Sequence, residues 1–316
     1  MAPVVVVGAG IAGVACARAL QVAVAGAAVR VLERGQVPGG RMASRRHGGR
    51  PVDIGAAYFT IRDAEFTQQV ASWERWGLVR RWTDTFAARE PDGNWRESTG
   101  PDRWAAPGGL HGLVTDLADG LDVRCGHTVR DITAGPRVDG EPAAAVVLAM
   151  PDPQAVRLLD PALEAAAEVR DRPWEPALVL TAEFTEPRWR PLRAAFVNGH
   201  DVLALVADDG DRRGDGAPVL VAHSTAAFAA SRLDDPAAAT PELLAAVQQL
   251  LGPLGDPGFT HVHRWSFARP VAARDKPFHL DCEGIGLAGD GWGSPRVETA
   301  WRSGTLLGRA LAARLG

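Results

Sequence analysis

The chain has 316 residues, of which 46% are hydrophobic, and this is enough apolar material to fill a large core and to exclude a disordered protein. Its 34 basic and 38 acidic residues give a formal net charge of −4 and no basic run that would attract nucleic acid. No apolar stretch reaches the roughly 18 residues of a membrane span, and the three cysteines lie singly without a CxxC pair. We therefore expect a cytoplasmic protein with no nucleic-acid partner, no membrane partner and no metal site.

The chain opens with a strand, a glycine-rich turn and a helix. Residues 4–7 are four valines, typical of a strand buried on both faces of a parallel sheet. The GxGxxG pattern of residues 8–13 follows directly and leads into a small-residue helix that reaches about Leu20. In such a turn the first glycine permits the tight bend, the second admits a pyrophosphate, and the third lets the helix pack on the strand. The predicted cofactor contacts here are Gly8, Gly10, Ile11, Ala12 and Gly13.

An acidic residue stands where a dinucleotide site needs one. Residues 29–32 form a second short β-rich run, and Glu33 ends it 20 residues after Gly13. A carboxylate at this point accepts hydrogen bonds from ribose hydroxyls. Because it would repel a 2′-phosphate, it favours FAD or NAD over NADP. Glu33 and the adjacent Arg34 are therefore predicted to contact the cofactor.

The middle of the chain mixes strands and helices. A threonine cap followed by Pro241 predicts a helix that ends at Gly252, and the charged run 208–216 is interpreted as a solvated loop. The last segment returns to a strand at 285–288, a glycine turn and a long helix opened by Ser294 and Pro295. Further strands are predicted at 121–123, 127–132, 143–150, 177–184 and 219–223.

Five segments, taken in order, resemble one known family. After Glu33 come a Gly-Gly-Arg triplet (39–41) and DIGAAYFT (53–60), then APGGLHGLVTDLA (106–118), HRWSFARPVAA (263–273) and the Gly-Asp-Gly turn at 289–291. Together they resemble renalase and its bacterial relatives, a branch of the flavin amine oxidase fold. The connection at 133–145 is shorter than this family leads us to expect.

The resemblance implies an α/β fold in which a Rossmann-type FAD-binding domain carries an inserted α+β substrate domain. The first would comprise residues 1–62, 101–154 and 283–316, and the second residues 63–100 and 155–282. FAD would be bound noncovalently, with the N-terminus of the last helix offering free N–H groups to the flavin ring. The further cofactor contacts implied are Gly40, Arg41, Met42, Asp53, Gly55, Ala56, Val129, Gly289, Asp290, Arg296 and Val297.

The substrate chemistry is inferred from the lysine content and from the resemblance. Many flavin amine oxidases use a lysine near the flavin, but Lys276, the single lysine of this chain, does not match that position. Renalase-type enzymes instead take hydride from dihydronicotinamide isomers and pass the electrons to dioxygen, forming hydrogen peroxide. Hydride transfer needs a flat apolar slot and correct positioning rather than a strong acid or base. The predicted catalytic residues are Tyr58, Trp265, Trp292 and His263, and Phe59 is predicted as a further wall of this slot.

Several residues keep two interpretations. His261 and His263 share one face of a predicted strand, where packing or substrate hydrogen bonding competes with metal binding. Trp265 fits either the core or the active site. Arg264 and Arg269 could hold a substrate diphosphate or line a solvated surface, and Glu298 could be catalytic or simply a favourable acid in a first helical turn.

Other classes of function also stay open. The expected substrate is a dihydronicotinamide dinucleotide with dioxygen as the acceptor, and the first alternative is a flavin amine oxidase or another FAD-dependent dehydrogenase. An NAD-dependent dehydrogenase would have no use for both the glycine doublet and the terminal Gly-Asp-Gly helix. A noncatalytic flavin-binding protein would retain the cofactor without turnover.

Overall fold

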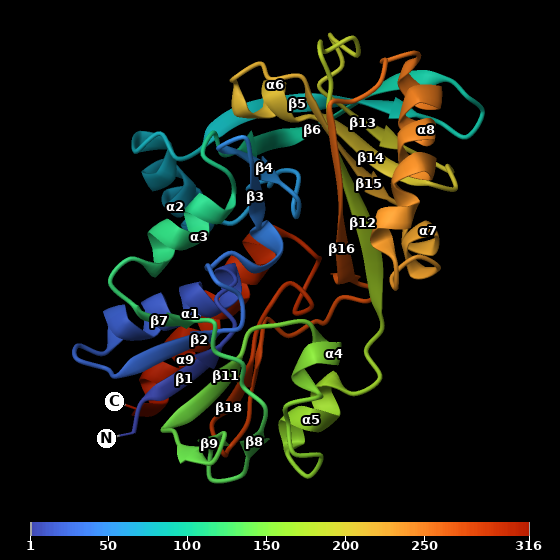
Figure 1. Cartoon of the computed structure of the whole chain (residues 1–316). Helices are drawn as coiled ribbons and strands as arrows, with labels where there is room; N and C mark the ends of the chain where they lie inside the picture. Colours follow the sequence, from blue (N-terminus) through green and yellow to red (C-terminus); the bar gives the residue numbers. More distant parts are fainter. Residues whose placement is uncertain (1, 316) are drawn as a thin grey trace.

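Two sheets dominate the protein, which is represented by a computed structural model describing residues 2–315. Figure 1 shows a six-stranded sheet with its helices in one half of the molecule and a seven-stranded sheet in the other. The hairpin of β3 (Ser44–His47) and β4 (Arg50–Asp53) lies between them. Within residues 2–315, no helix is long and apolar enough to cross a membrane.

The six-stranded sheet is parallel except at one edge, where β17 runs antiparallel to β18. Its central strand β1 pairs with β11 on one side and β2 on the other. Val4 and Val6 enter the hydrophobic core on one face, and Val5 and Val7 enter the core on the opposite face. This explains why four consecutive valines form the strand. In spatial order the strands are β17 (His279–Leu280), β18 (Ile285–Leu287), β11 (Ala145–Leu148), β1 (Val4–Val7), β2 (Val29–Glu33) and β7 (Asp122–Cys125).

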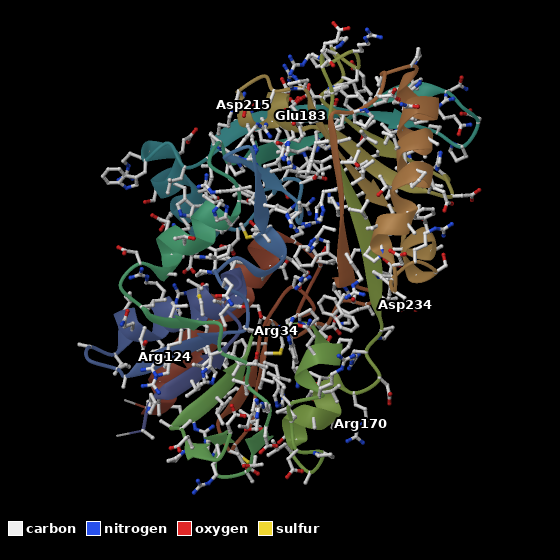
Figure 2. All side chains as sticks on the ribbon, viewed as in Figure 1. Arg34, Arg124, Arg170, Glu183, Asp215 and Asp234 are labelled. Carbon is white, nitrogen blue, oxygen red and sulfur yellow. The ribbon has the colours of Figure 1, made fainter. Side chains whose placement is uncertain are left out.

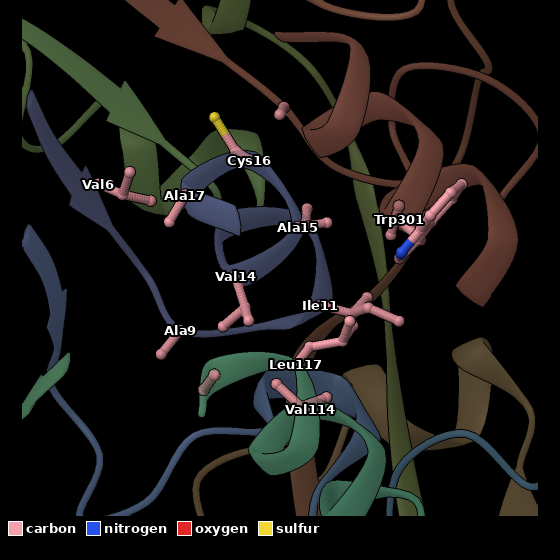
Figure 3. Close-up of a cluster of buried hydrophobic side chains, with 14 of the residues drawn as sticks. Val6, Ala9, Ile11, Val14, Ala15, Cys16, Ala17, Val114, Leu117 and Trp301 are labelled. Atoms are coloured by element: carbon pink, nitrogen blue, oxygen red, sulfur yellow. The ribbon is translucent and has the colours of Figure 1, made fainter. Parts of the chain in front are cut away.

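Helices α1 (Ile11–Ala23) and α9 (Val297–Leu315) cover one face of this sheet and bring the two ends of the chain together. Figure 3 shows Ile11 and Val14 of α1 in the same apolar cluster as Trp301 of α9 and Val114 of α3. The two longer helices approach so closely that a Cβ on Gly304 would lie 1.9 Å from the carbonyl oxygen of Ala12. The remaining helices of this core are α2 (Ala64–Arg75) and α3 (His111–Ala118).

The other face of the sheet carries shorter elements. Three two-residue strands, β8 (Ile132–Thr133), β9 (Arg137–Val138) and β10 (Glu141–Pro142), form the connection into β11. The predicted strand at 127–132 is therefore wrong over nearly its whole length, because these residues pair with no neighbouring strand until Ile132. Helices α4 (Asp152–Ala155) and α5 (Glu164–Val169) complete this layer.

The seven-stranded sheet has one face against helices and one face toward the interior of the molecule. Leu178 and Leu180 pack with α7 (Ala226–Ala230) and α8 (Thr240–Leu251), while Val179 points to the opposite side. Figure 1 shows α7 and α8 along the outer face. In spatial order the strands are β16 (Phe259–Pro270), β12 (Trp174–Glu183), β15 (Val219–Ser224), β14 (Leu203–Asp208), β13 (Ala194–Val197), β5 (Arg80–Arg89) and β6 (Trp95–Ala105).

The prediction of a solvated loop at 208–216 holds for the exposed residues 214–216 and is wrong for residues 208–213. Residues 209–213 form α6 (Asp209–Arg213), in which Asp209 and Arg212 have no exposed surface. Arg50 donates to the Asp209 carboxylate over 2.5 Å, and Arg213 does so over 3.0 Å. The charges are satisfied by one another rather than by water, which is how proteins bury ionised groups.

Helix starts also differ in detail from the prediction. The 3₁₀ turn η2 (Pro236–Ala239) leads directly into α8, so Thr240 is its first residue rather than its cap. The last helix begins at Val297, after Ser294 and Pro295. A second 3₁₀ turn, η1 (Gly40–Met42), contains part of the glycine doublet.

The predicted domain boundaries cut across some of these elements. Strand β6 crosses the boundary at residue 100, and β17 belongs to the six-stranded sheet although it precedes residue 283. Phe66 and Trp73 of α2 also pack in the core of the first sheet. The mixed α/β fold with its Rossmann-like sheet is as predicted, whereas the division into segments stays a prediction.

The close crossing of α1 and α9 generates a stability prediction. Gly304→Ala places a methyl group against the α1 backbone and should lower the free energy of unfolding by roughly 2–3 kcal/mol. Gly112→Ala in α3 is the matched control, since its Cβ would meet no atom within 4 Å. That variant should be neutral or slightly stabilising, because alanine has the higher helix propensity. Urea unfolding of the two variants provides the comparison, and equal stabilities would contradict this account of the crossing.

Candidate functional site

A cavity of about 1370 Å³ lies between the two sheets. It exceeds the roughly 300–1,000 Å³ of most small-molecule pockets, so it can hold a large cofactor and a substrate together. One end adjoins the carboxyl ends of the parallel strands, where open α/β sheets bind ligands. Residues from these strand ends that line it are Val7 of β1, Leu32 of β2, Ala149 just after β11 and Gly289 just after β18.

The turn after β1 is built for close backbone contact. Gly8 has a φ of +104°, and a Cβ there would lie 2.7 Å from the carbonyl oxygen of Ala149. Gly13 faces inward, where a Cβ would lie 2.0 Å from the carbonyl oxygen of Gly8. Gly13 thus packs the helix on the turn and does not line the cavity, whereas Gly8, Gly10, Ile11 and Ala12 all do.

Glu33 is held beside this turn. Its Oε2 accepts from the backbone N–H of Ala9 over 2.8 Å, and its Oε1 accepts from that of Gly35 over 2.6 Å. The carboxylate is therefore fixed at the cavity wall with lone pairs left for further donors, such as ribose hydroxyls. Arg34 is exposed and lines the cavity beside it (Figure 2).

The glycine doublet packs directly on the first turn. The N–H of Gly39 donates to the carbonyl of Ala9 over 2.9 Å, and a Cβ on Gly40 would lie 3.1 Å from the Cα of Gly10. The carbonyl of Arg41 then accepts from Ala56 over 2.9 Å. A Cβ on Gly55 would lie 2.0 Å from that same oxygen. The turn of residues 8–13, the triplet 39–41 and Gly55 thus form one continuous wall, which we call the glycine wall. Met42 also lines the cavity there.

A bidentate ion pair lines the cavity next to this wall. Arg41 donates from its two Nη atoms to the two carboxylate oxygens of Asp290 over 2.7 and 2.5 Å. The same guanidinium donates to the carbonyl of Ala268 over 3.1 Å and lies 4.8 Å from the Trp174 ring. Arg296 and Val297 line the cavity where α9 begins. The pair joins the first sheet to β16 of the second.

Two other predicted residues lie away from the cavity. Asp53 is buried, accepts from the backbone N–H of Leu110 over 2.9 Å, and lies 3.1 Å from the Arg213 guanidinium. Trp292 was expected to form a wall of the substrate slot, and this is wrong. Its indole packs in the core beneath the six-stranded sheet, with the Arg274 guanidinium 4.2 Å from the ring. The predicted contact Val129 does line the cavity.

The opposite end of the cavity is formed mainly by the seven-stranded sheet. Trp265 donates from Nε1 to the carbonyl of Ile54 over 2.6 Å, which fixes the indole at the wall. The His263 ring meets it edge to face at 4.6 Å, and Tyr58 meets Phe86 in the same way at 5.2 Å. Tyr58, His263 and Trp265 are therefore brought together at one end of the cavity.

Two lining residues were not singled out by the sequence. His223 of β15 and Arg103 of β6 both line this end of the cavity. His223 alternates with Val219 and Val221 on one side of its strand, so a polar residue in an otherwise apolar alternation was the available signal. Nothing local distinguishes Arg103, because the residues it contacts come from other strands.

Burial keeps His223 and His263 uncharged. It lowers the pKa of His223 to about 4, with the Arg212 guanidinium adding to the effect. Burial also lowers the pKa of His263 to about 4, helped by His261 and Arg45. At neutral pH the two rings are therefore hydrogen-bonding groups without charge.

The other residues with two interpretations from the sequence have defined contacts in the structure. His261 lies 3.1 Å from Arg45, and the described residues contain no cluster of three or more potential metal ligands. Arg264 donates to the Leu233 carbonyl and Arg269 pairs with Glu175, although both also line the cavity rim. Glu298 is buried. Its Oε1 accepts from the backbone N–H groups of residues 62 and 63 over 2.6 Å each, which gives it a structural role.

The comparison with known families agrees with this geometry. Residues 6–71 match the NAD(P)-binding Rossmann-like domain, and residues 83–310 match the model for flavin containing amine oxidoreductase. The second match covers well over half of the chain. The protein belongs to the flavin containing amine oxidoreductase family.

Solved structures with the same fold are distant in sequence. A putative protoporphyrinogen oxidase from Exiguobacterium sp. 255-15 superposes with a TM-score of 0.78 at 14% identity, over 99% of both chains. Cyclohexylamine oxidase from Brevibacterium oxydans IH-35A gives 0.78 at 16% identity, also over 99% of both. A wild-type putrescine oxidase bound to putrescine gives 0.71 at 16%, covering 99% of this chain and 98% of the other.

As a member of this family the protein is a flavin-dependent enzyme, and its cavity fits a flavin. The glycine wall leaves bare backbone at the surface, and a carboxylate and an arginine are fixed on either side of it. A bound flavin would supply the capacity to accept hydride from a substrate. Lys276, the single lysine, is exposed and does not line the cavity.

The lowered pKa of His223 predicts a pH-dependent stability. The folded-state pKa of His223, about 4, lies below its ordinary value of 6.5, so its contribution is complete above pH 6.5 and is lost as the pH falls toward 4. Between pH 7 and pH 5 the flavin-free protein should lose about 2 kcal/mol through this group.

Urea unfolding at the two pH values tests this prediction with His223→Asn, which removes the titrating ring. That variant should lose correspondingly less stability between pH 7 and pH 5 than the parent. His127→Asn, a change of an exposed imidazole, is the control and should keep the parent's pH dependence. If His223→Asn also kept it, the assigned neutral state of His223 would be wrong.

Proposed function

We propose that the protein is a renalase-like, FAD-dependent oxidase. It would take hydride from dihydronicotinamide isomers reduced at the wrong ring position, and dioxygen would receive the electrons with protons to give hydrogen peroxide. The observation that carries this proposal is the character of the cavity end at Tyr58 and Trp265. Fixed aromatic side chains and neutral histidines face the glycine wall there, and neither a lysine nor a carboxylate lines that end among residues 2–315.

Such walls are suited to a planar hydride donor. Hydride transfer depends on stacking and close approach, and it needs no strong base beside the reacting carbon. The Trp265 indole, held by its hydrogen bond to the Ile54 carbonyl, would orient a flat ring. Tyr58, on the segment that follows β4, would form a further wall of the slot. We propose Tyr58, His263 and Trp265 as the substrate-contacting residues.

FAD bound noncovalently is the cofactor that fits best. The turn of residues 8–13 and Glu33 supply what the adenosine and pyrophosphate of a dinucleotide require. Arg41 and Asp290 lie farther along the same cavity, where a longer cofactor would continue. No cysteine lines the cavity among residues 2–315, so thiol attachment has no group to use there.

Amine oxidation is the second candidate, and the family match is what favours it. The solved relatives include a putrescine oxidase and a cyclohexylamine oxidase, although likeness at 16% identity concerns the fold alone. Within residues 2–315, eight arginines line the cavity against two acidic residues, an environment that disfavours a protonated amine. We therefore rank amine substrates below dihydronicotinamides.

The role proposed for Glu33 is tested by retention of the cofactor. Glu33→Arg places a positive charge where ribose hydroxyls need an acceptor and breaks the bonds to Ala9 and Gly35. The purified variant should lose most of its FAD, measured from the ratio of visible to ultraviolet absorbance. Glu186→Arg makes the same charge change at an exposed site and should retain parental FAD. Equal FAD content in both would remove Glu33 from the site.

The reaction itself is tested by anaerobic titration of the holoprotein with a borohydride-reduced NAD isomer mixture. Bleaching of the flavin absorbance, followed by recovery and hydrogen peroxide formation when air is admitted, is the expected result. A flavin that bleaches with cyclohexylamine or putrescine but not with the isomer mixture would favour the amine oxidase alternative. A flavin reduced by neither would contradict both assignments.

A further inference from the structure

The cavity end away from the glycine wall has a charge that its surroundings do not balance. We call this end the substrate chamber and define it by Tyr58, Arg103, Leu205, His223, His263 and Trp265, all of which line the cavity. Strand register places Leu205, His223, Val179 and His263 side by side across four strands. Side chains directly opposite in neighbouring strands share a face, so both histidines project from the same side of the sheet.

Arg103 is the charged group of the chamber. Its side chain is buried, with the residue only 5% exposed, and its guanidinium carbon lies 4.1 Å from the centre of the Phe86 ring. The rings of Tyr58 and Phe196 lie at 5.6 and 5.8 Å from the same carbon. The aromatic rings hold the planar guanidinium in place and partly compensate its charge.

No carboxylate of residues 2–315 neutralises Arg103. Among the described residues its one hydrogen-bond acceptor is the backbone carbonyl of Asp84, reached by Nη1, and it takes part in no ion pair. Two other arginines at the cavity are paired, Arg41 with Asp290 and Arg269 with Glu175, and none of the other arginines that line it is buried as Arg103 is. Buried cations in proteins are normally paired, so an unpaired one that lines a cavity indicates an anionic ligand.

The rest of the cavity strengthens this electrostatic preference. Glu33 and Asp290 are the only acidic residues that line it within residues 2–315, and both are engaged, by backbone N–H groups and by Arg41. Neither belongs to the substrate chamber. A cationic substrate would therefore meet Arg103 with no carboxylate to receive it.

His223 supplies a second, uncharged point of recognition. Its Nε2 is buried without a protein partner in the described part of the chain, although the residue lines the cavity. The nitrogens of a neutral imidazole donate and accept hydrogen bonds, so a ligand in the cavity can offer a polar atom to this ring. Phe196, which packs against Arg103, pairs with Leu205 on the next strand, and Leu205 pairs with His223 on the strand after that. His223 would therefore contact a different part of the ligand from Arg103.

We propose that the substrate chamber binds an anionic oxygen group of the substrate, a carboxylate or a phosphate, on Arg103 and an uncharged polar atom on His223. The chamber thereby selects anionic hydride donors over cationic amines. This inference rests on the proposed function, which it extends from the kind of reaction to the charge of the substrate. Arg103 is a substrate-binding residue in this assignment, and no step of the reaction passes through it.

The test compares two probes of the same ring and opposite charge. Benzoate and benzylamine are titrated into the oxidised holoprotein, and binding is followed by the shift of the visible flavin spectrum and by tryptophan fluorescence. Benzoate should bind at least about tenfold more tightly than benzylamine, as expected for a charge-assisted hydrogen bond. Benzylamine binding as tightly, or an absence of benzoate binding, would overturn the proposal.

Variants assign the preference to Arg103. Arg103→Gln should weaken benzoate binding at least about tenfold without weakening benzylamine, and Arg103→Lys should restore part of the loss because it keeps the charge. Arg96→Gln is the matched control, since it makes the same change on the same strand at an exposed residue outside the cavity. In folded, flavin-containing protein, benzoate binding by Arg103→Gln as tight as by Arg96→Gln would overturn the assignment. So would Arg103→Lys binding benzoate no more tightly than Arg103→Gln does.

The two proposals fail separately. Benzoate preference that depends on Arg103, in a protein whose flavin is not bleached by the NAD isomer mixture, would retain the anion site and reject the proposed reaction. Bleaching by the isomer mixture without any benzoate preference would retain the reaction and reject the role of Arg103.

Discussion

Close backbone contact at glycines is the constraint on which the cofactor end of the molecule depends. Gly8 leaves no room for a side chain against Ala149, Gly40 approaches Gly10, and Gly55 lies against the Arg41 carbonyl. Each contact joins segments that are separate in the sequence, and together they produce a wall without side chains. A polar ligand can then reach backbone N–H groups at the start of α1, where the helix dipole favours negative charge. The same principle joins α1 to α9, where Gly304 brings the two ends of the chain into one core.

A buried ionic cluster fixes one segment of the cavity wall. Asp209 of α6 accepts from Arg50, Arg212 and Arg213, while Arg212 also donates to the Ala57 carbonyl over 2.8 Å. Ala57 precedes Tyr58, so the cluster fixes the segment that forms part of the cavity wall. Outside this cluster, Asp215 and Glu183 (Figure 2) bind Arg50 and His47 of the β3–β4 hairpin, each over 2.7 Å. Buried charges contribute little net stability when paired, but removal of one partner leaves the other uncompensated. The hairpin is therefore held in a single position between the two sheets.

The cavity divides into two chemical environments. Its cofactor end presents bare backbone and fixed charges, a combination suited to a dinucleotide. Its substrate end presents aromatic rings, neutral histidines and one unbalanced arginine. Low pKa values of His223 and His263 follow from burial, and they leave Arg103 as the charge of the chamber at neutral pH. The difference between the two ends arises because one belongs to the six-stranded sheet and the other mainly to the seven-stranded sheet.

The sequence by itself determined the features that depend on neighbouring residues. The valine strand, the GxGxxG turn, Glu33 and the last helix are all encoded within short segments, because turn geometry and strand periodicity are local properties. Tertiary structure decided what lies opposite each segment. It buried Trp292 and Asp53 away from the cavity, converted a charged run into α6, and brought Arg103 and His223 into one chamber. These outcomes depend on contacts between separate segments, such as Asp53 with Arg213 and Arg50 with Asp209, and the charge or polarity of a single side chain does not reveal its partner.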